Sequence, residues 1–137
     1  MSENISGAVS GALNPDSDEA KRHTEQYYES VRKMTTDVKN IAKNTNMSEN
    51  DIKDIKNYLF VDKHDLEYGH KRFDESYDIA QSWQRLIDGK DIKTQDMTLL
   101  HHELLEMRLV KNGMTQDSAH IIATKQYNYA KESDKGR

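Results

Sequence analysis

The segment Met97-Thr-Leu-Leu-His-His-Glu-Leu-Leu-Glu-Met-Arg-Leu-Val110 decides the fold. Its apolar residues lie on almost every side of a helix with 3.6 residues per turn, so we expect a central, buried helix over residues 96–112. The same helix carries His102, Glu103 and Glu106 among those apolar residues. Burying carboxylates is costly unless they are paired, protonated or bound to a metal, so these three residues mark a candidate site.

The spacing of His102 and Glu106 predicts a metal-binding pair. They are four residues apart and face the same way on a helix, as do the two histidines of the metal-binding motif His-Glu-x-x-His. Here a glutamate replaces the second histidine, and histidine with carboxylate ligation suits zinc or manganese. Glu103 would then be the general acid or base. The alternative is a structural network in which both glutamates pair with basic residues of neighbouring helices.

His120 is the candidate third metal ligand. The short connection Gly113-Met-Thr115 predicts that the last helix folds back antiparallel to the central one. This arrangement brings His120 toward His102. The alternative is an ordinary histidine at a helix interface.

The stretch 59–74 has no clear helical periodicity and contains Gly69. We expect a loop with a brief extended segment at 58–61. Within the loop, His64 and Arg72 are predicted catalytic residues that hold an anionic group. The alternative is that they are solvated loop charges.

Arg85 is a further predicted catalytic residue, on the polar face of a helix that buries Ile79 and Trp83. That helix would be capped by Asp74 and end at Gly89. The alternative for Arg85 is a surface or salt-bridged arginine.

The whole pattern predicts an all-α fold. We expect one domain over residues 17–133, with five to six helices packed around the buried central helix. Residues 1–16 are predicted to form a flexible, disordered arm, and residues 134–137 a frayed tail. Helices are expected to begin near 16–18 and at caps Ser48, Thr94 or Asp96, and Thr115, the last running to about residue 131.

Composition narrows the function classes. The chain has 137 residues, 32% of them charged, with a net charge of −4 and no cysteine. Disulfides and thiolate metal sites are therefore excluded. The acidic balance does not favour a nonspecific nucleic-acid binder, so nucleic acid is expected only as a substrate. No apolar run approaches the roughly 20 residues that span a bilayer, and the N-terminus lacks the features of a signal peptide.

A helix-turn-helix regulator is a further alternative, because residues 37–59 predict two helices joined by a turn. The second of these helices balances Asp51 and Asp54 against Lys53 and Lys56. It therefore lacks the basic face that DNA binding requires.

Several stretches along the chain also resemble the C-terminal module of phage minor head (Mu F-like) proteins of Gram-positive hosts. They are Ser6-Gly-Ala-Val-Ser-Gly-Ala-Leu-Asn-Pro15, Ala20-Lys-Arg-His-Thr-Glu-Gln-Tyr-Tyr28, Thr36-Asp-Val-Lys-Asn-Ile-Ala-Lys-Asn-Thr45, Asp62-Lys-His-Asp-Leu66, Arg72-Phe-Asp74, Ala80-Gln-Ser-Trp-Gln-Arg-Leu86, Leu99-Leu-His-His-Glu103, Ala119-His120 and Tyr127-Asn-Tyr129. Together they cover nearly the whole chain.

The resemblance implies a phage or prophage origin and a toxin-like effector domain, located in the bacterial cytoplasm or on the virion. Its signature positions include Trp83 as well as the candidate site residues named above. The first functional hypothesis is a small effector enzyme, a hydrolase or nuclease that depends on His and Glu residues or on a metal. The alternative is a non-catalytic phage accessory module that binds a virion or host protein through its helical faces.

Overall fold

The computed structural model describes residue 14 and residues 16–135. These residues form one mostly helical domain with a small two-stranded hairpin. The predicted arm at 1–16 lies almost entirely outside the described residues, as do the last two residues of the predicted tail. The helices are α1 (Asp18–Lys33), α2 (Asp37–Thr45), α3 (Glu49–Lys56), α4 (Tyr77–Asp88), α5 (Thr94–Lys111), α6 (Gln116–Gln126) and α7 (Tyr129–Lys135).

Helix starts follow the predicted capping residues in most places. The side chain of Ser17 accepts a hydrogen bond from the Ala20 amide at the start of α1, and Ser48 does the same for Asp51 in α3. Thr115 caps α6. The prediction that Thr94 or Asp96 caps α5 is wrong: the N-cap is Lys93, and Asp96 lies in the first turn, where its carboxylate accepts the Lys93 amide. Hydrogen bonds between residues close in sequence therefore fix where these helices begin.

The prediction that Asp74 caps α4 is wrong. The cap is Ser76, whose hydroxyl accepts the Ile79 amide, and the helix begins at Tyr77. Its end at Gly89 is confirmed: φ is +70° there, which glycine adopts without strain.

Two other differences concern residues 57–71. The segment 58–61 is not extended; it belongs to a π-helical turn, Asn57–Val61, that continues α3. Strands β1 (His64–Leu66) and β2 (Gly69–Lys71) follow as an antiparallel hairpin with Asp65 opposite His70. The all-α prediction therefore holds for the helical framework but missed this hairpin.

The last predicted helix is divided. It breaks after Gln126, and α7 then runs from Tyr129 to Lys135, so residues 134 and 135 are helical rather than frayed. This break, together with the separation of α1 from α2, gives seven helices in the described residues, where five or six were expected.

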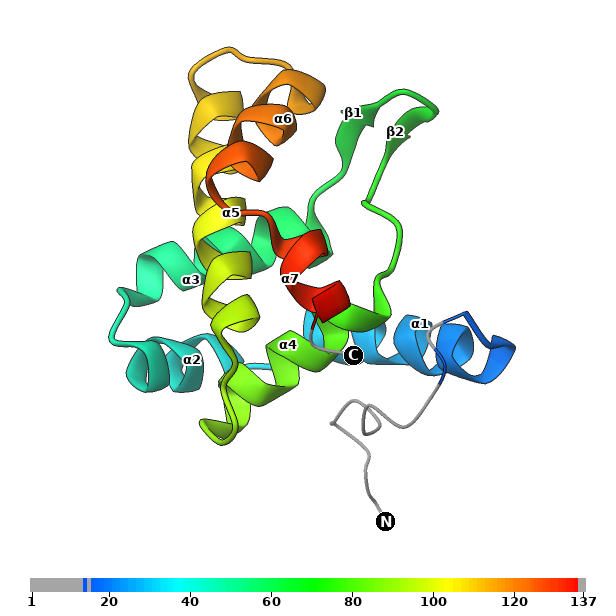
Figure 1. The fold of residues 1–137 in the computed structure, drawn as a ribbon, viewed down its shortest axis with the longest axis vertical. Helices are drawn as coiled ribbons and strands as arrows, with labels where there is room; N and C mark the ends of the chain where they lie inside the picture. Colours follow the sequence, from blue (N-terminus) through cyan, green and yellow to red (C-terminus); the bar gives the residue numbers. More distant parts are fainter. Residues whose placement is uncertain (1–13, 15, 136–137) are drawn as a thin grey trace.

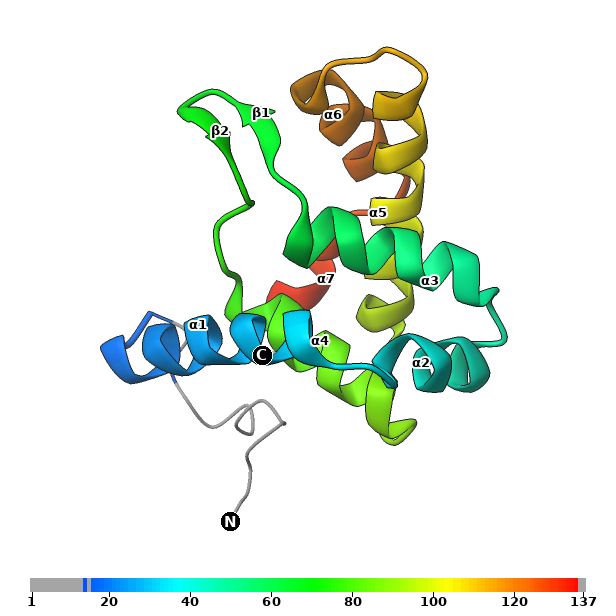
Figure 2. The ribbon, with the colours of Figure 1, turned by 180° about the vertical axis from the view of Figure 1, so that it is seen from behind.

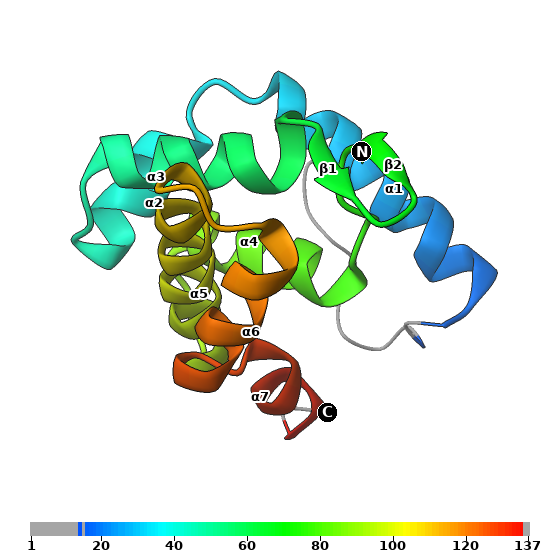
Figure 3. The ribbon, with the colours of Figure 1, turned by 90° about the horizontal axis from the view of Figure 1, so that it is seen from above.

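Helix α5 is the centre of the domain, as predicted. Its Leu99, Leu100 and Leu104 are buried, and α3, α4, α6 and α7 all pack against it (Figure 1). Seen from behind, α3 crosses α5 above α2 and α4 (Figure 2). The view from above places α5 between α3 and the α6–α7 pair (Figure 3). No helix in the described part of the chain has the length and apolar character needed to cross a bilayer.

Candidate metal centre

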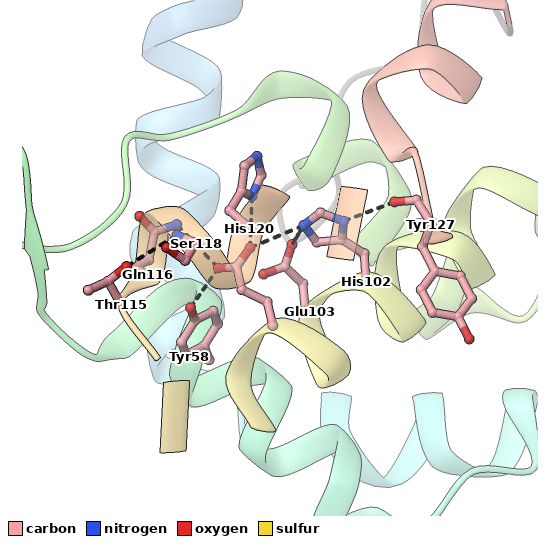
Figure 4. A network of polar contacts seen from close by, with 9 residues as sticks. Tyr58, His102, Glu103, Thr115, Gln116, Ser118, His120 and Tyr127 are labelled. Carbon is pink, nitrogen blue, oxygen red and sulfur yellow. Dashed lines mark hydrogen bonds and ion pairs between the residues drawn. The ribbon is translucent and has the colours of Figure 1, made fainter. Parts of the chain in front are cut away.

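Three side chains predicted to bind a metal meet between α5 and α6. The ligand atoms of His102, Glu106 and His120 all lie within 4.8 Å of one another. Glu106 Oε1 is 3.2 Å from His102 Nε2 and 2.7 Å from His120 Nδ1. We call these three residues the His-Glu-His cluster (Figure 4).

The local sequence explains this convergence. His102 and Glu106 are one helical turn apart on α5 and therefore project from the same face. Gly113, with φ at +105°, lies in the short turn that reverses the chain into α6. Helix α6 packs along α5, which brings His120 over Glu106.

Glu106 is a buried and ionised carboxylate. Its second oxygen, Oε2, accepts a hydrogen bond of 2.6 Å from the Tyr58 hydroxyl and one of 3.3 Å from the Gln116 amide. Burial alone would raise the pKa of Glu106, but hydrogen bonds from His102, His120, Tyr58 and Gln116 outweigh it and lower that pKa to about 2. The cluster is therefore built around a persistent negative charge.

His102 is oriented by a backbone carbonyl. Its Nδ1 lies 2.9 Å from the Tyr127 carbonyl oxygen, which only accepts, so Nδ1 carries a proton and donates it. Nε2 then faces Glu106 Oε1 at 3.2 Å and Glu103 Oε2 at 3.8 Å. In a neutral ring, Nε2 would present a lone pair to these oxygens, so this position calls for a proton or a metal cation. Histidine ligands of metals commonly donate their other N–H to such a carbonyl.

Glu103 lies beside the cluster and is almost fully buried, with 7% of its surface exposed. Burial, followed by the charge of Glu106, raises the pKa of Glu103 well above its usual value. Two carboxylates three residues apart thus differ in their affinity for a proton. That difference is typical of acid–base pairs in active sites.

His120 gives the cluster access to solvent. Its side chain is 55% exposed, whereas those of His102 and Glu106 are nearly covered. Its hydrogen bond to Glu106 raises the pKa of His120, against the effect of partial burial. A cavity of about 160 Å³ opens beside His120 and is also lined by Glu103, Glu106 and Gln116.

Two of the three ligand separations are close to those around a tetrahedral zinc ion. With bonds of about 2.0–2.1 Å, neighbouring ligand atoms would be about 3.3 Å apart. The separations of 3.2 and 2.7 Å from Glu106 Oε1 are near this value, and the closer pair would need to separate by roughly half an ångström. The two histidine nitrogens lie within 4.8 Å of each other. Two imidazoles and one carboxylate form a catalytic zinc set and match manganese, which prefers oxygen ligands, less well.

His64 and Arg72 lie at the base of the hairpin rather than in the cluster. The His64 Nε2–H donates to the Tyr58 carbonyl at 2.7 Å, and the ring stacks on Phe73 at 4.1 Å. The exposed Arg72 donates from Nε to the Val61 carbonyl at 3.1 Å. These bonds anchor the hairpin, and a role in anion binding remains a prediction.

Arg85 is paired elsewhere. Its guanidinium donates two hydrogen bonds, of 2.8 and 2.7 Å, to the fully buried carboxylate of Asp96 and also contacts Ser82. This geometry matches the alternative interpretation, a salt-bridged arginine, and places Arg85 outside the His-Glu-His cluster.

Two residues of the site were not predicted from the sequence. Gln116 lies four residues before His120 on α6, so helical spacing gave a usable signal. Tyr58 comes from the π-helical turn, 48 residues before Glu106, and no local pattern connects the two.

No protein-family model, no curated protein and no solved structure matches this chain. The resemblance to phage head-protein modules therefore stays an expectation drawn from the sequence.

Proposed function

We propose that this chain is a metal-dependent hydrolase in which His102, Glu106 and His120 hold one zinc ion and Glu103 is the general acid and base. The observation that carries the proposal is the convergence of three ligand atoms within 4.8 Å. Catalytic zinc sites commonly use three protein ligands and leave a fourth position open for water or substrate.

The surroundings of Glu106 support ligation. Tyr58 and Gln116 donate to Oε2, which leaves Oε1 as the oxygen that faces both histidines. Such partners orient a ligating carboxylate and are part of most metal sites. A bound zinc ion would lower the pKa of a water in its open position to about 7 and polarise a substrate carbonyl.

The position of Glu103 supports a role in proton transfer. It lines the same cavity as Glu106 and His120. In hydrolysis, water adds to the electrophilic atom, Glu103 takes a proton from that water, and the bond to the leaving group breaks. Glu103 then delivers the proton to the leaving atom, so that atoms and charge balance.

The proposed biological setting follows the sequence resemblance: a phage- or prophage-encoded, toxin-like effector acting in the bacterial cytoplasm or associated with the virion. Growth of a bacterial host that expresses either the wild type or Glu103→Gln tests this setting. Toxicity that requires Glu103 would support it, and equal growth with both proteins would count against it in that host.

A second candidate is a non-catalytic accessory module that binds a virion or host protein. One observation favours it: Glu106 is fully hydrogen-bonded by Tyr58, Gln116, His102 and His120 without any ion. Such a fully hydrogen-bonded network could have a purely structural role, which is to hold α5 against α6.

The deciding experiment compares metal content and hydrolysis in five proteins, the wild type and four variants. We expect the wild type to retain one zinc per chain after dialysis, and His102→Ala and Glu106→Gln to lose it. His70→Ala is the histidine control, because His70 is exposed on β2 and is not one of the three clustered residues. Glu103→Gln should keep zinc but lose hydrolysis of an activated ester. A wild type that binds no zinc, cobalt or manganese would refute the enzyme and favour the accessory module.

A further inference from the structure

The cavity beside the His-Glu-His cluster has walls that select a substrate. From these walls we infer that the chain acts on neutral acyl compounds, amides or esters, that carry a short aliphatic group, and not on phosphodiesters. The inference rests on the proposed hydrolase function and names the group that the cavity receives.

Part of the cavity lining is apolar. It includes Leu59, Phe73, Ile79 and the ring of Tyr28, whose hydroxyl accepts the Ser76 amide at 3.0 Å. A surface of this kind gains free energy by covering an aliphatic group and has no partner for a charged one.

The size of the cavity limits that group. Its volume is about 160 Å³. A water molecule occupies about 30 Å³ in the liquid, so the cavity holds about five groups of that size. An acyl chain of three to five carbons fits, and a longer chain would have to extend into solvent.

The charged groups that line the cavity do not favour a phosphodiester. The carboxyl groups of Glu103, Glu106 and Asp74 line it, Asp74 being paired with Lys71 at 3.1 Å, and the described residues that line it include no lysine or arginine. Proteins usually bind phosphate oxygens with those cationic side chains. A divalent ion held by the cluster would be offset in part by the charge of Glu106, which would weaken its attraction for an anionic substrate. A neutral carbonyl does not need that attraction.

The chemical step is then acyl hydrolysis. Water adds to the carbonyl carbon, and the bond from that carbon to the leaving nitrogen or oxygen breaks. The water proton is delivered to the leaving atom, which gives a carboxylic acid and an amine or alcohol. The aliphatic part of the acyl group stays against the apolar side chains that line the cavity.

Short hydroxamic acids test the inference without depending on turnover, because their head group binds the metal and their tail probes the cavity. Cobalt(II)-loaded full-length chain is titrated with acetohydroxamate, butyrohydroxamate and octanohydroxamate, and binding is followed by the visible absorption of cobalt. Each buried methylene should tighten binding about fourfold. We therefore expect butyrohydroxamate to bind on the order of tenfold tighter than acetohydroxamate, and octanohydroxamate to bind no tighter than butyrohydroxamate.

Separate controls test the charge of the ligand tail and the shape of the cavity. The monohydroxamate of succinic acid, which replaces the methyl end of butyrohydroxamate by a carboxylate, should bind at least tenfold more weakly. Ile79→Phe should remove the gain from acetohydroxamate to butyrohydroxamate, and Ile79→Ala should shift the preference toward octanohydroxamate. Ile87→Phe is the matched control, since Ile87 is partly buried on α4 but does not line the cavity.

The outcomes separate the inference from the proposed function. Equal affinity across the chain lengths, tighter binding of the succinic compound, or faster hydrolysis of bis(p-nitrophenyl) phosphate than of p-nitrophenyl butyrate would overturn the inference. If cobalt binding in those cases still depends on His102, the proposed metal site would be retained. Failure to bind cobalt would overturn both.

Discussion

Two carboxylates on one face of α5 hold their protons differently because their neighbours differ. Glu106 accepts hydrogen bonds from four side chains, and its pKa falls to about 2. Glu103 is buried next to that charge, and its pKa rises. A metal ion would offset the charge of Glu106 and so reduce the cost of ionising the buried Glu103. The metal-free protein carries that cost in full.

Glu103→Gln should make the metal-free protein more stable above about pH 5. The folded-state pKa of Glu103 is raised, so wild-type unfolding releases a proton once the pH exceeds about 4.3, the unfolded value. The wild type then loses about 1.4 kcal/mol for each pH unit up to its folded pKa, and the glutamine variant does not. Urea unfolding in the presence of a chelator at pH 5, 6, 7 and 8 measures the difference. A difference that does not grow with pH would contradict the burial argument.

Arg85→Ala should destabilise the fold without affecting the metal site. The substitution leaves the buried carboxylate of Asp96 without its partner, which costs about 3–5 kcal/mol in comparable pairs. Arg108→Ala is the control, because Arg108 is an exposed partner of Asp51 and such pairs contribute about 0–1 kcal/mol. Urea unfolding and zinc content are measured for both. An Arg85→Ala protein of unchanged stability that retains zinc but has lost hydrolysis would restore the catalytic role predicted from the sequence.

The sequence predicts the three candidate ligand residues better than it predicts the residues that hold them in place. His102, Glu106 and His120 follow from helical spacing and one short turn, which are local properties. The sequence predicts a catalytic role for Arg85 because it does not reveal that Asp96 forms an ion pair with the Arg85 guanidinium. Tyr58 reaches Glu106 only through the packing of α5 against the π-helical turn, and no pattern along the chain records that contact.

Among the elements, the break between α6 and α7 matters most for the site. The Tyr127 carbonyl at the break accepts the His102 ring N–H at 2.9 Å and also the Tyr129 amide at 3.1 Å, instead of the amide four residues on that a continuing helix would supply. No glycine or proline marks this position. Tertiary contacts accompany the break: the Tyr127 ring stacks on His101 at 5.5 Å, and the Tyr129 hydroxyl is bonded to Ser82. A single continuous helix was therefore the natural prediction, and it was wrong.

Asn128→Ala tests the importance of this break. The Asn128 side chain accepts the Lys131 amide at 3.0 Å and so caps α7, and loss of such a cap costs about 1 kcal/mol. We also expect weaker zinc binding, because the Tyr127 carbonyl that orients His102 would lose its fixed place. Asn50→Ala, exposed in the first turn of α3, is the control. Zinc affinity and urea midpoints are measured for both, and unchanged zinc affinity in Asn128→Ala would show that the carbonyl is held by other contacts.

Gly89→Ala should also be destabilising. The backbone there has φ at +70°, and a Cβ atom would lie 2.8 Å from the carboxamide of Asn44, which itself binds the Leu86 and Ile87 carbonyls at the end of α4. The backbone strain alone costs about 1–2 kcal/mol. Thermal unfolding followed by circular dichroism measures the loss. Gly69→Ala is the comparison, because its φ is also positive but its Cβ would meet open space. Equal losses in the two variants would mean that the contact with Asn44 contributes nothing.

At the scale of the molecule, the helical framework was predictable and the hairpin was not. The amphipathic patterns of α1 to α4 indicate which of their faces are buried, and the central position of α5 follows from its apolar residues on almost every side. Strands of three residues are too short to show a period of two. The hairpin is instead positioned by His64 and Arg72, which bind carbonyls of the π-helical turn.

The proposed metal links the site to the stability of the whole domain, because its ligands come from both α5 and α6. Zinc that binds only the folded state should stabilise it by about 2.7 kcal/mol at a free concentration 100 times the dissociation constant. The pKa of His120 is raised in the fold, so its protonated pair with Glu106 stabilises the metal-free protein below about pH 6.5 and is lost as pH rises through the raised value. Zinc requires the neutral ring, so its own contribution grows over the same range.

The stability gap between zinc-loaded and chelator-treated protein should therefore widen from pH 6 to pH 8. Urea midpoints at three pH values measure the gap, and calorimetry in two buffers of different ionisation enthalpy counts the protons released on binding. His120→Asn should flatten the part of the pH dependence that comes from this ring, whereas His23→Asn, on α1 and not among the three clustered residues, should leave it intact. A gap that is constant across the range would mean that zinc does not displace a proton from His120, and the cluster would then lose its third ligand.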